Sequence, residues 1–294
     1  MRSYRVLIWT TVVIVSSAAI GFPAVVLHRH HAAVAALEHR DSITLTTLAR
    51  PESEYRLVRE YDSLVSTVER ADFQETVQPA DMRHLQNLRG LTGVSFQNVT
   101  ESAWAFLPRQ LESLEFTLHT DQPNSAAWEQ IVRLKHLKEL SLEGGGHSAD
   151  QHLSKILTLL PSLKAVRLQN LPLSPATLQA ILTHKPDLES LEISNWEEGG
   201  TAGGLTDAEI ELISHHHGIK ELEVDGNKRL TNASFDHLAK MTSLKLLYIT
   251  PPPDDSPATL AQRKLKPEGL EKLRILRPDL EINPMPIYGC FGGF

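Results

Sequence analysis

Apolar residues recur at a fixed spacing along most of the chain, in the pattern L-x-x-L-x-L. Successive copies start 20 to 36 residues apart, and a degenerate last copy contains Leu280 and Ile282. A pattern that keeps its phase over so many copies predicts a stack of similar units rather than a single closed core. The seven complete copies start at Leu91, Leu111, Leu137, Leu163, Leu188, Ile219 and Leu244.

Each copy predicts a short strand, because alternate side chains of a strand point to opposite faces of a sheet. The segments between the copies predict helices with marked starts. Thr206 and Glu209 have the spacing of a capping box, and Ser174 followed by Pro175 is typical of a helix start. Strands that alternate with helices predict an α/β fold with a parallel sheet.

Two segments of the chain resemble a known family. They are residues 205–224 (LTDAEIELISHHHGIKELEV) and residues 230–249 (LTNASFDHLAKMTSLKLLYI). They are similar to leucine-rich repeats that open with a Leu/Ile-Thr-Asp-Ala-Gly-Leu signature, although Glu209 and Ser234 replace the usual glycine. Together with the N-terminal layout, they resemble membrane-anchored proteins of planctomycete-type bacteria. The resemblance implies that residues 80–283 form a horseshoe-shaped solenoid of about eight repeats, with a concave parallel sheet, convex helices and a binding role. It implies no catalytic residue.

The N-terminus contains an uncharged segment, residues 6–27, after a short tail of residues 1–5 that carries Arg2 and Arg5. A helix of this length crosses the ~30 Å hydrocarbon core of a bilayer, so we interpret the segment as an uncleaved transmembrane anchor. A cleaved signal peptide that ends at the small residues 17–19 (SAA) and a buried core helix are alternatives. The charges slightly favour a cytoplasmic N-terminus and repeats outside the cytoplasm. Cleavage would instead give a secreted protein.

Residues 28–79 separate this segment from the repeats and are interpreted as a stalk followed by a helical cap. The cap is predicted over residues 53–68, where apolar residues recur at three- and four-residue spacing. A solenoid needs such a cap because its first repeat has an open hydrophobic edge. The C-terminal tail, residues 284–294, has no repeat features, and it either covers the last repeat or stays unstructured.

The outward positions of the predicted strands give a candidate binding surface on the concave face, with many acidic side chains and a single basic one. Such a face predicts a groove for a basic protein partner, with an apolar anchor at its C-terminal end. The alternative is that these side chains are only solvated. The candidate residues are Glu115, Glu139, Glu143, Arg167, Glu192, Glu221, Glu223, Asp225, Leu246 and Tyr248.

Net charge and residue content argue against some classes of function. A net charge of −7 and the lack of long basic runs argue against nucleic acid as the main partner. Cys290 is the only cysteine, so an intramolecular disulfide is impossible. The run 215–217 (HHH) resembles a metal cluster, but adjacent side chains diverge, so no metal is predicted.

No catalytic motif such as GxSxG or HExxH occurs, and we predict no cofactor and no catalytic residue. The sequence therefore predicts a membrane-anchored protein–protein interaction module rather than an enzyme. The alternative is an enzyme or enzyme subunit that uses two insert loops, residues 197–204 and 251–267. The identity of the partner and the oligomeric state are left open.

Overall fold

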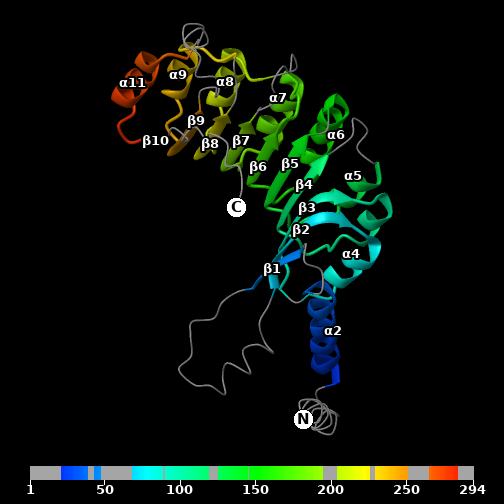
Figure 1. The fold of residues 1–294 in the computed structure, drawn as a ribbon. Coiled ribbons are helices and arrows are strands. Elements are labelled where there is room, and N and C mark those ends of the chain that lie inside the picture. The colour runs from blue at the N-terminus through cyan, green and yellow to red at the C-terminus, as the bar shows by residue number, and fades with distance from the viewer. Residues whose placement is uncertain are drawn as a thin grey trace, which may run out of the picture. The chain divides into compact units, whose positions relative to one another are not determined.

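The chain folds into two compact units, Met1–Pro108 and Arg109–Phe294, in a computed structural model (Figure 1). The units are described separately below. The structure describes residues 21–38, 43–47, 68–88, 90–118, 125–144, 146–194, 204–225, 229–250 and 265–283.

The first unit contains a small sheet in which β2 is the central strand. It pairs in parallel with β3 and antiparallel with β1, so an antiparallel strand closes this edge of the sheet. The elements, in chain order, are α2 (Gly21–Glu38), β1 (Ile43–Thr47), β2 (Val68–Val77), α4 (Pro79–Leu85), β3 (Gly93–Val99) and the 3₁₀ helix η1 (Glu101–Phe106).

The segment predicted as a stalk and cap takes part in this unit. Helix α2 contacts α4 and β1, and it buries His30, Ala33 and Leu37 on one face. Strand β2 also lies in this segment, so the parallel sheet of the first unit begins before residue 80. Residues 53–67 of the predicted capping helix lie outside the described residues, and Val68 is the first residue of β2.

The predicted membrane anchor lies mostly outside the described residues, which begin at Gly21 within α2. In the part of the chain that the structure describes, no helix is both long and apolar enough to span a bilayer.

The second unit repeats a strand-and-helix alternation, as a leucine-rich-repeat-like solenoid does. Its strands follow one another in chain order, each parallel to the next from β4 to β10, and its helices lie along one face of them (Figure 1). The strands are β4 (Ser113–Leu118), β5 (Glu139–Gly144), β6 (Ala165–Gln169), β7 (Ser190–Ser194), β8 (Glu221–Asp225), β9 (Leu246–Thr250) and β10 (Glu281–Asn283). The helices are α5 (Ser125–Ile131), α6 (Gly146–Leu159), α7 (Pro175–His184), α8 (Asp207–Ser214), α9 (Ala233–Leu238) and α11 (Pro267–Leu276).

The apolar positions of the repeat pattern form continuous columns under this sheet. In one column the register aligns the second apolar residue of each copy, and these side chains are at most 1% exposed. This confirms the predicted phase of the strands, because a slip of one residue would turn every apolar side chain to the other face. The column contains Leu140, Val166, Leu191, Leu222 and Leu247.

At the N-terminal ends of the helices, side chains connect successive repeats. The third residue of the Leu-Thr-Asp-Ala-Gly-Leu-like segment accepts a hydrogen bond from the backbone N–H of the second residue in the next repeat. This satisfies a helix-terminal or loop donor that would otherwise be unpaired. The connections join the amide of Ser174 to Asp150 (3.0 Å), that of Thr231 to Asp207 (2.9 Å) and that of Lys266 to Asn232 (2.7 Å).

These connections explain why the fifth residue is small in the segments that start α9 and α11. A Cβ atom on Gly269 would lie 2.6 Å from side-chain atoms of Asn232 and Phe235. Ser234, which replaces the usual glycine, is fully buried and donates its hydroxyl hydrogen bond to Asp207. The repeat with serine in place of glycine therefore keeps the tight packing at this position and adds a hydrogen bond to the preceding repeat.

Candidate functional site

The outward side chains of the second unit form rows across its strands. The register places Glu139 beside Ala165, Arg167 beside Glu192, and Glu143 beside Gln169. The first row is Ser113, Glu139, Ala165, Ser190, Glu221 and Leu246, and the second is Glu115, Ser141, Arg167, Glu192, Glu223 and Tyr248.

The predicted acidic groove is divided into two parts. Glu139 and Glu143 lie on β5, whereas Glu221 and Glu223 lie on β8, three strand steps away. At a strand spacing of about 4.8 Å, this separation is about 14 Å. The strands between them present Ala165, Ser190 and other uncharged side chains, along with one ion pair. The acidic side chains therefore do not act as one continuous surface.

Glu192 differs from the prediction, because its carboxylate is not exposed on the surface where a partner would bind. It is 8% exposed, and its carboxylate lies 3.2 Å from the Arg167 guanidinium. The carboxylate also accepts hydrogen bonds from the Gln169 amide (2.6 Å) and the Ser194 hydroxyl (3.3 Å). The side chains of Arg167 and Gln169 on the neighbouring strand contact Glu192, and the guanidinium balances its charge. Arg167 is thereby paired as well, although its side chain stays exposed on the predicted surface.

Six of the predicted residues meet in one shallow hollow, which we call the β8–β9 patch. Glu221 is exposed at its rim, while Glu223, Leu246 and Tyr248 are half-buried. The patch thus combines acidic groups with an aliphatic and an aromatic side chain on the face that carries no helices. It is lined by Arg167, Ser190, Glu192, Glu221, Leu222, Glu223, Leu246 and Tyr248.

The remaining predicted residues lie outside the patch. Glu115 and Glu139 lie on β4 and β5, and Glu143 accepts a hydrogen bond from the Thr117 hydroxyl (3.1 Å). Asp225 is the last residue of β8 and pairs with Ser194 in the register, but its side chain is outside the described part of the structure.

An ion-pair row along the edge of the strand face was not predicted. The residue after the first leucine of each copy contributes to it. Glu189 accepts from both Lys164 and Lys220, at 2.7 Å each. The hydrogen bonds from these two lysines, followed by their charge, lower the pKa of the Glu189 carboxyl to about 2. The sequence signal was that this position carries charges of both signs in successive copies, as in Glu112 and Lys138, which also pair, at 2.6 Å.

The histidine run has a structural role at its middle residue. The His216 ring is buried and its Nε2 atom lies 2.8 Å from the Lys185 carbonyl oxygen of the preceding repeat. Lys185 in turn donates to the Leu160 carbonyl, and burial lowers the pKa of its ammonium group. Within the described ranges, no group of three or more His, Cys, Asp or Glu is placed to hold a metal ion.

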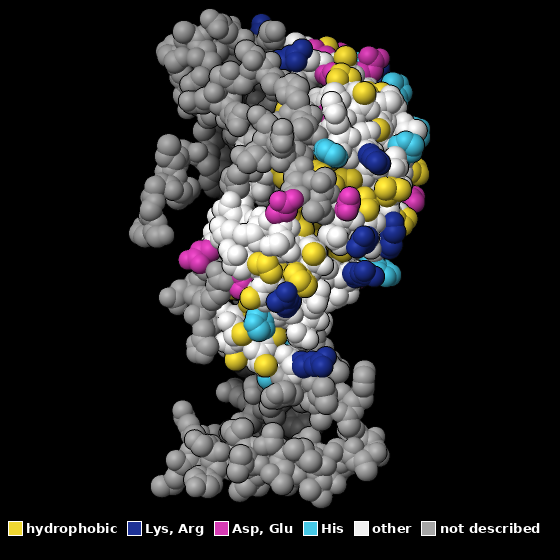
Figure 2. All heavy atoms as spheres, turned by 90° about the vertical axis from the view of Figure 1, so that its right-hand side faces the viewer, with side chains coloured by type: hydrophobic (Ala, Val, Ile, Leu, Met, Phe, Trp, Pro, Cys, Tyr) yellow, Lys and Arg dark blue, Asp and Glu magenta, His cyan; other side chains and the backbone are white. Residues whose placement is uncertain are grey.

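The helix side of the second unit has a mixed surface. Figure 2 looks onto the side on which α5 and α6 lie in Figure 1, and its described residues show hydrophobic, basic, acidic and histidine side chains interspersed. Of the insert loops proposed for an enzyme, residues 197–203 and 251–264 lie outside the described residues.

Comparison with known proteins gives a limited structural similarity and no family. No family model matches the chain, and no curated protein matches it. Among solved structures, the chain is similar to a chain of the crystal structure of the Rad7 and Elc1 complex in yeast, at 14% identity and a TM-score of 0.40. The similarity covers 67% of this chain and 60% of that one, so the chain spans about 60% of the length of its structural neighbour.

Proposed function

We propose that this protein is a protein-interaction module that binds its partner on the β8–β9 patch. The proposal rests on one observation. Glu221 and Glu223 line the same hollow as the half-buried side chains of Leu246 and Tyr248. Clustered charge beside a partly buried aromatic side chain is typical of the few residues that dominate a protein interface. The outward face of the sheet is also where solenoids place their binding surfaces.

The chemistry of the patch favours a partner segment with a lysine or arginine next to an apolar side chain. Glu221 and Glu223 are two residues apart on one strand, so their side chains leave the sheet on the same face. A cation between them also lies next to the Tyr248 ring, which attracts cations through its π-face. Leu246, beside Glu221 in the register, gives the apolar contact.

We further propose that residues 6–27 tether the module to a membrane and that the repeats lie outside the cytoplasm. The support is the uncharged 22-residue sequence that follows Arg2 and Arg5. Secretion after cleavage near residue 19 is the competing outcome.

A crosslinking experiment with matched charge reversals tests the patch. A photoreactive amino acid at Tyr248 of the full chain captures the partner, which is then purified and titrated. We expect E221K/E223K to raise the Kd at least tenfold. E129K/E211K is the control, because it makes the same charge change at exposed positions of α5 and α8. Equal Kd values for both variants and the wild type would contradict the proposed site.

A further inference from the structure

The last helix of the second unit, α11, carries two adjacent aliphatic side chains on its surface. Ile275 is 72% exposed and Leu276 is 52% exposed. Together with Pro267 and Leu270 they border a hollow that is lined by residues of α11 alone. Exposed aliphatic groups of this size are unfavourable in water, and a local cluster of them indicates a contact surface.

The helix that carries these side chains is held by contacts of its other residues. On its other face α11 buries Gly269 and Leu273, and it contacts α9. Lys272 forms an ion pair with Asp236 of α9 at 2.6 Å. The exposed pair therefore belongs to a helix that is fixed along its length.

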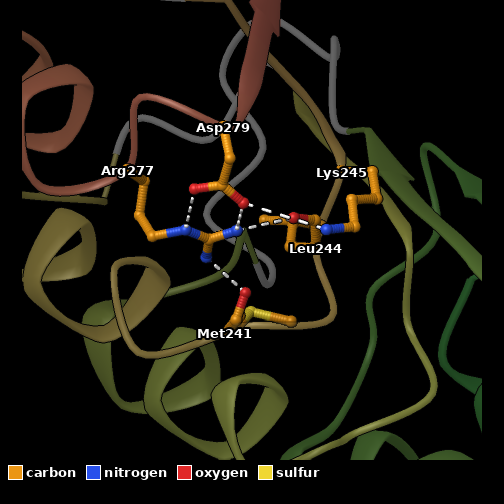
Figure 3. Close-up of polar contacts among 5 residues, drawn as sticks. All are labelled: Met241, Leu244, Lys245, Arg277 and Asp279. Carbon is orange, nitrogen blue, oxygen red and sulfur yellow. Dashed lines mark hydrogen bonds and ion pairs between the residues drawn. The ribbon is translucent and has the colours of Figure 1, made fainter.

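The end of α11 is fixed by the next residue, Arg277. Its buried guanidinium donates to the carbonyl oxygens of Met241 and Leu244, the latter at 2.8 Å (Figure 3). It also pairs with Asp279, with an Nε–Oδ1 distance of 2.8 Å. The hydrogen bond with Asp279 raises the pKa of Arg277, so the guanidinium that makes these contacts stays charged. We call these contacts of Arg277 the clamp.

The repeat itself does not require apolar residues at these two positions. Helix α7 ends in the same pattern, because Lys185, Pro186, Asp187 and Leu188 match the segment 277–280 (RPDL). The positions that correspond to Ile275 and Leu276 are occupied in α7 by residues 183–184 (TH), and both are exposed. Helix α6 has an exposed leucine, Leu159, at the position of Leu276, but Thr158 precedes it, so neither α6 nor α7 has the adjacent aliphatic pair of α11.

We infer that the C-terminal tail, residues 284–294, docks on this aliphatic surface of α11. The tail follows β10 directly, and so starts in the same repeat as α11. It lies outside the described residues. Its sequence, PMPIYGCFGGF, has no charged residue and contains five large apolar side chains. Eleven residues can reach about 36 Å when extended, which is more than the width of one repeat.

The size of the surface favours an attached segment over a second copy of the chain. A stable interface between separate proteins buries about 800 Å² on each partner. Four apolar side chains on a single helix are too few for this. A covalently attached segment has an effective concentration in the millimolar range, so a small surface is enough to bind it.

Cys290 makes the inference testable, because it lies in the tail and is the only cysteine of the chain. The measurement is the rate at which Ellman's reagent modifies Cys290 in the full native chain and in the chain unfolded in urea. We expect the native rate to be at least tenfold slower. The variant I275D/L276D should raise the native rate at least fivefold, because it places charges where the tail docks.

The control is L159D, which places one aspartate on an exposed leucine at the position of α6 that corresponds to Leu276. It should leave the rate of Cys290 within twofold of the wild type. I275S/L276S repeats the test without added charge, and circular dichroism shows that each variant is folded. A native rate equal to the unfolded rate, and unchanged in both double variants, overturns the inference. A dimer in light scattering that the double variants abolish, without a change in the Cys290 rate, assigns the surface to a second copy and also overturns it.

Discussion

Asp207 joins two repeats through a single carboxylate. It accepts hydrogen bonds from the amide and hydroxyl of Thr231, at 2.9 and 2.6 Å, and from the hydroxyl of Ser234. Burial raises the pKa of Asp207, but the hydrogen bonds from Ser234 and Thr231 outweigh it, so the pKa lies below its ordinary value of 3.8. The charged form is therefore the one that stabilises the fold.

The substitution D207A should lower the free energy of unfolding by about 1–3 kcal/mol, because it leaves three donors without their acceptor. Urea denaturation followed by circular dichroism measures the change. E211A, at an exposed position of the same helix, should stay within about 0.5 kcal/mol of the wild type. If D207A unfolds at the same urea concentration as E211A, the carboxylate does not connect the repeats.

Glu189 gives a prediction for pH. Its pKa of about 2 in the folded protein lies below the 4.5 of a free glutamate. A depressed pKa means that its stabilising contribution is fully present above pH 4.5 and is lost as the pH falls toward 2. Because the group is exposed, salt should reduce this contribution.

A carbon-detected NMR titration of the Glu189 carboxyl should give a pKa near 2 in the wild type. The double variant K164M/K220M should return it toward 4.5, because both of its partners are then neutral. An unshifted titration in that variant would show that the lysines do not set the pKa.

At the scale of elements, the last repeat depends on a clamp at the end of its helix. Arg277 fixes the loop between α11 and β10 to the carbonyl oxygens of the preceding repeat (Figure 3). Lys185 and His216 make equivalent contacts in earlier repeats, so a buried donor after the helix recurs along the solenoid. β10 is only three residues long, and in its described part β9 is its paired strand. The clamp therefore contributes more to the stability of this repeat than the equivalent contacts contribute to that of the inner repeats.

The substitution R277Q should increase hydrogen exchange of amides in α11 and β10 at least tenfold, while β5 to β7 stay protected. Charged hydrogen bonds contribute about 1.5–3 kcal/mol each, and a tenfold change needs about 1.4 kcal/mol. R274Q is the control, since Arg274 is exposed and forms its ion pair with Glu271 of the same helix. Uniform exchange in both variants would mean that the clamp does not hold the end of the solenoid.

For the whole molecule, the two units combine a small sheet closed by an antiparallel strand with a run of seven strands and their helices. In the second unit the apolar columns form the core, and the outward rows differ from strand to strand. Acidic side chains are therefore distributed unevenly on the strand face: β5 and β8 both carry them, and those of β8 lie next to the apolar ones of β9.

Protease treatment of intact cells tests the proposed topology of the chain. If residues 6–27 anchor it with the repeats outside the cytoplasm, added protease should digest residues 80–283 without cell lysis, and deletion of residues 1–27 should stop the export. Protection of the repeats in intact cells would place them in the cytoplasm. Release of the undigested protein into the medium would instead indicate cleavage of the N-terminal segment.

The residues of the site show how far prediction from the sequence extended. Which side chains point outward followed from a two-residue period, so Glu221, Glu223, Leu246 and Tyr248 were all placed on the correct face. Which of them act together did not follow, because paired residues on neighbouring strands are 25 to 35 residues apart in sequence. The burial of Glu192 is the clearest example.

The sequence by itself determined the α/β class, the phase of the strands and the capped start of α8, where Glu209 accepts from the Thr206 amide at 2.7 Å. These features depend on local periodicity and on contacts within a few residues. Only the tertiary structure decided that Arg167 and Gln169 cover Glu192, and that the acidic residues of β5 and β8 are separate. Those outcomes depend on the register between strands, which brings distant residues together and sets the exposure and charge of each.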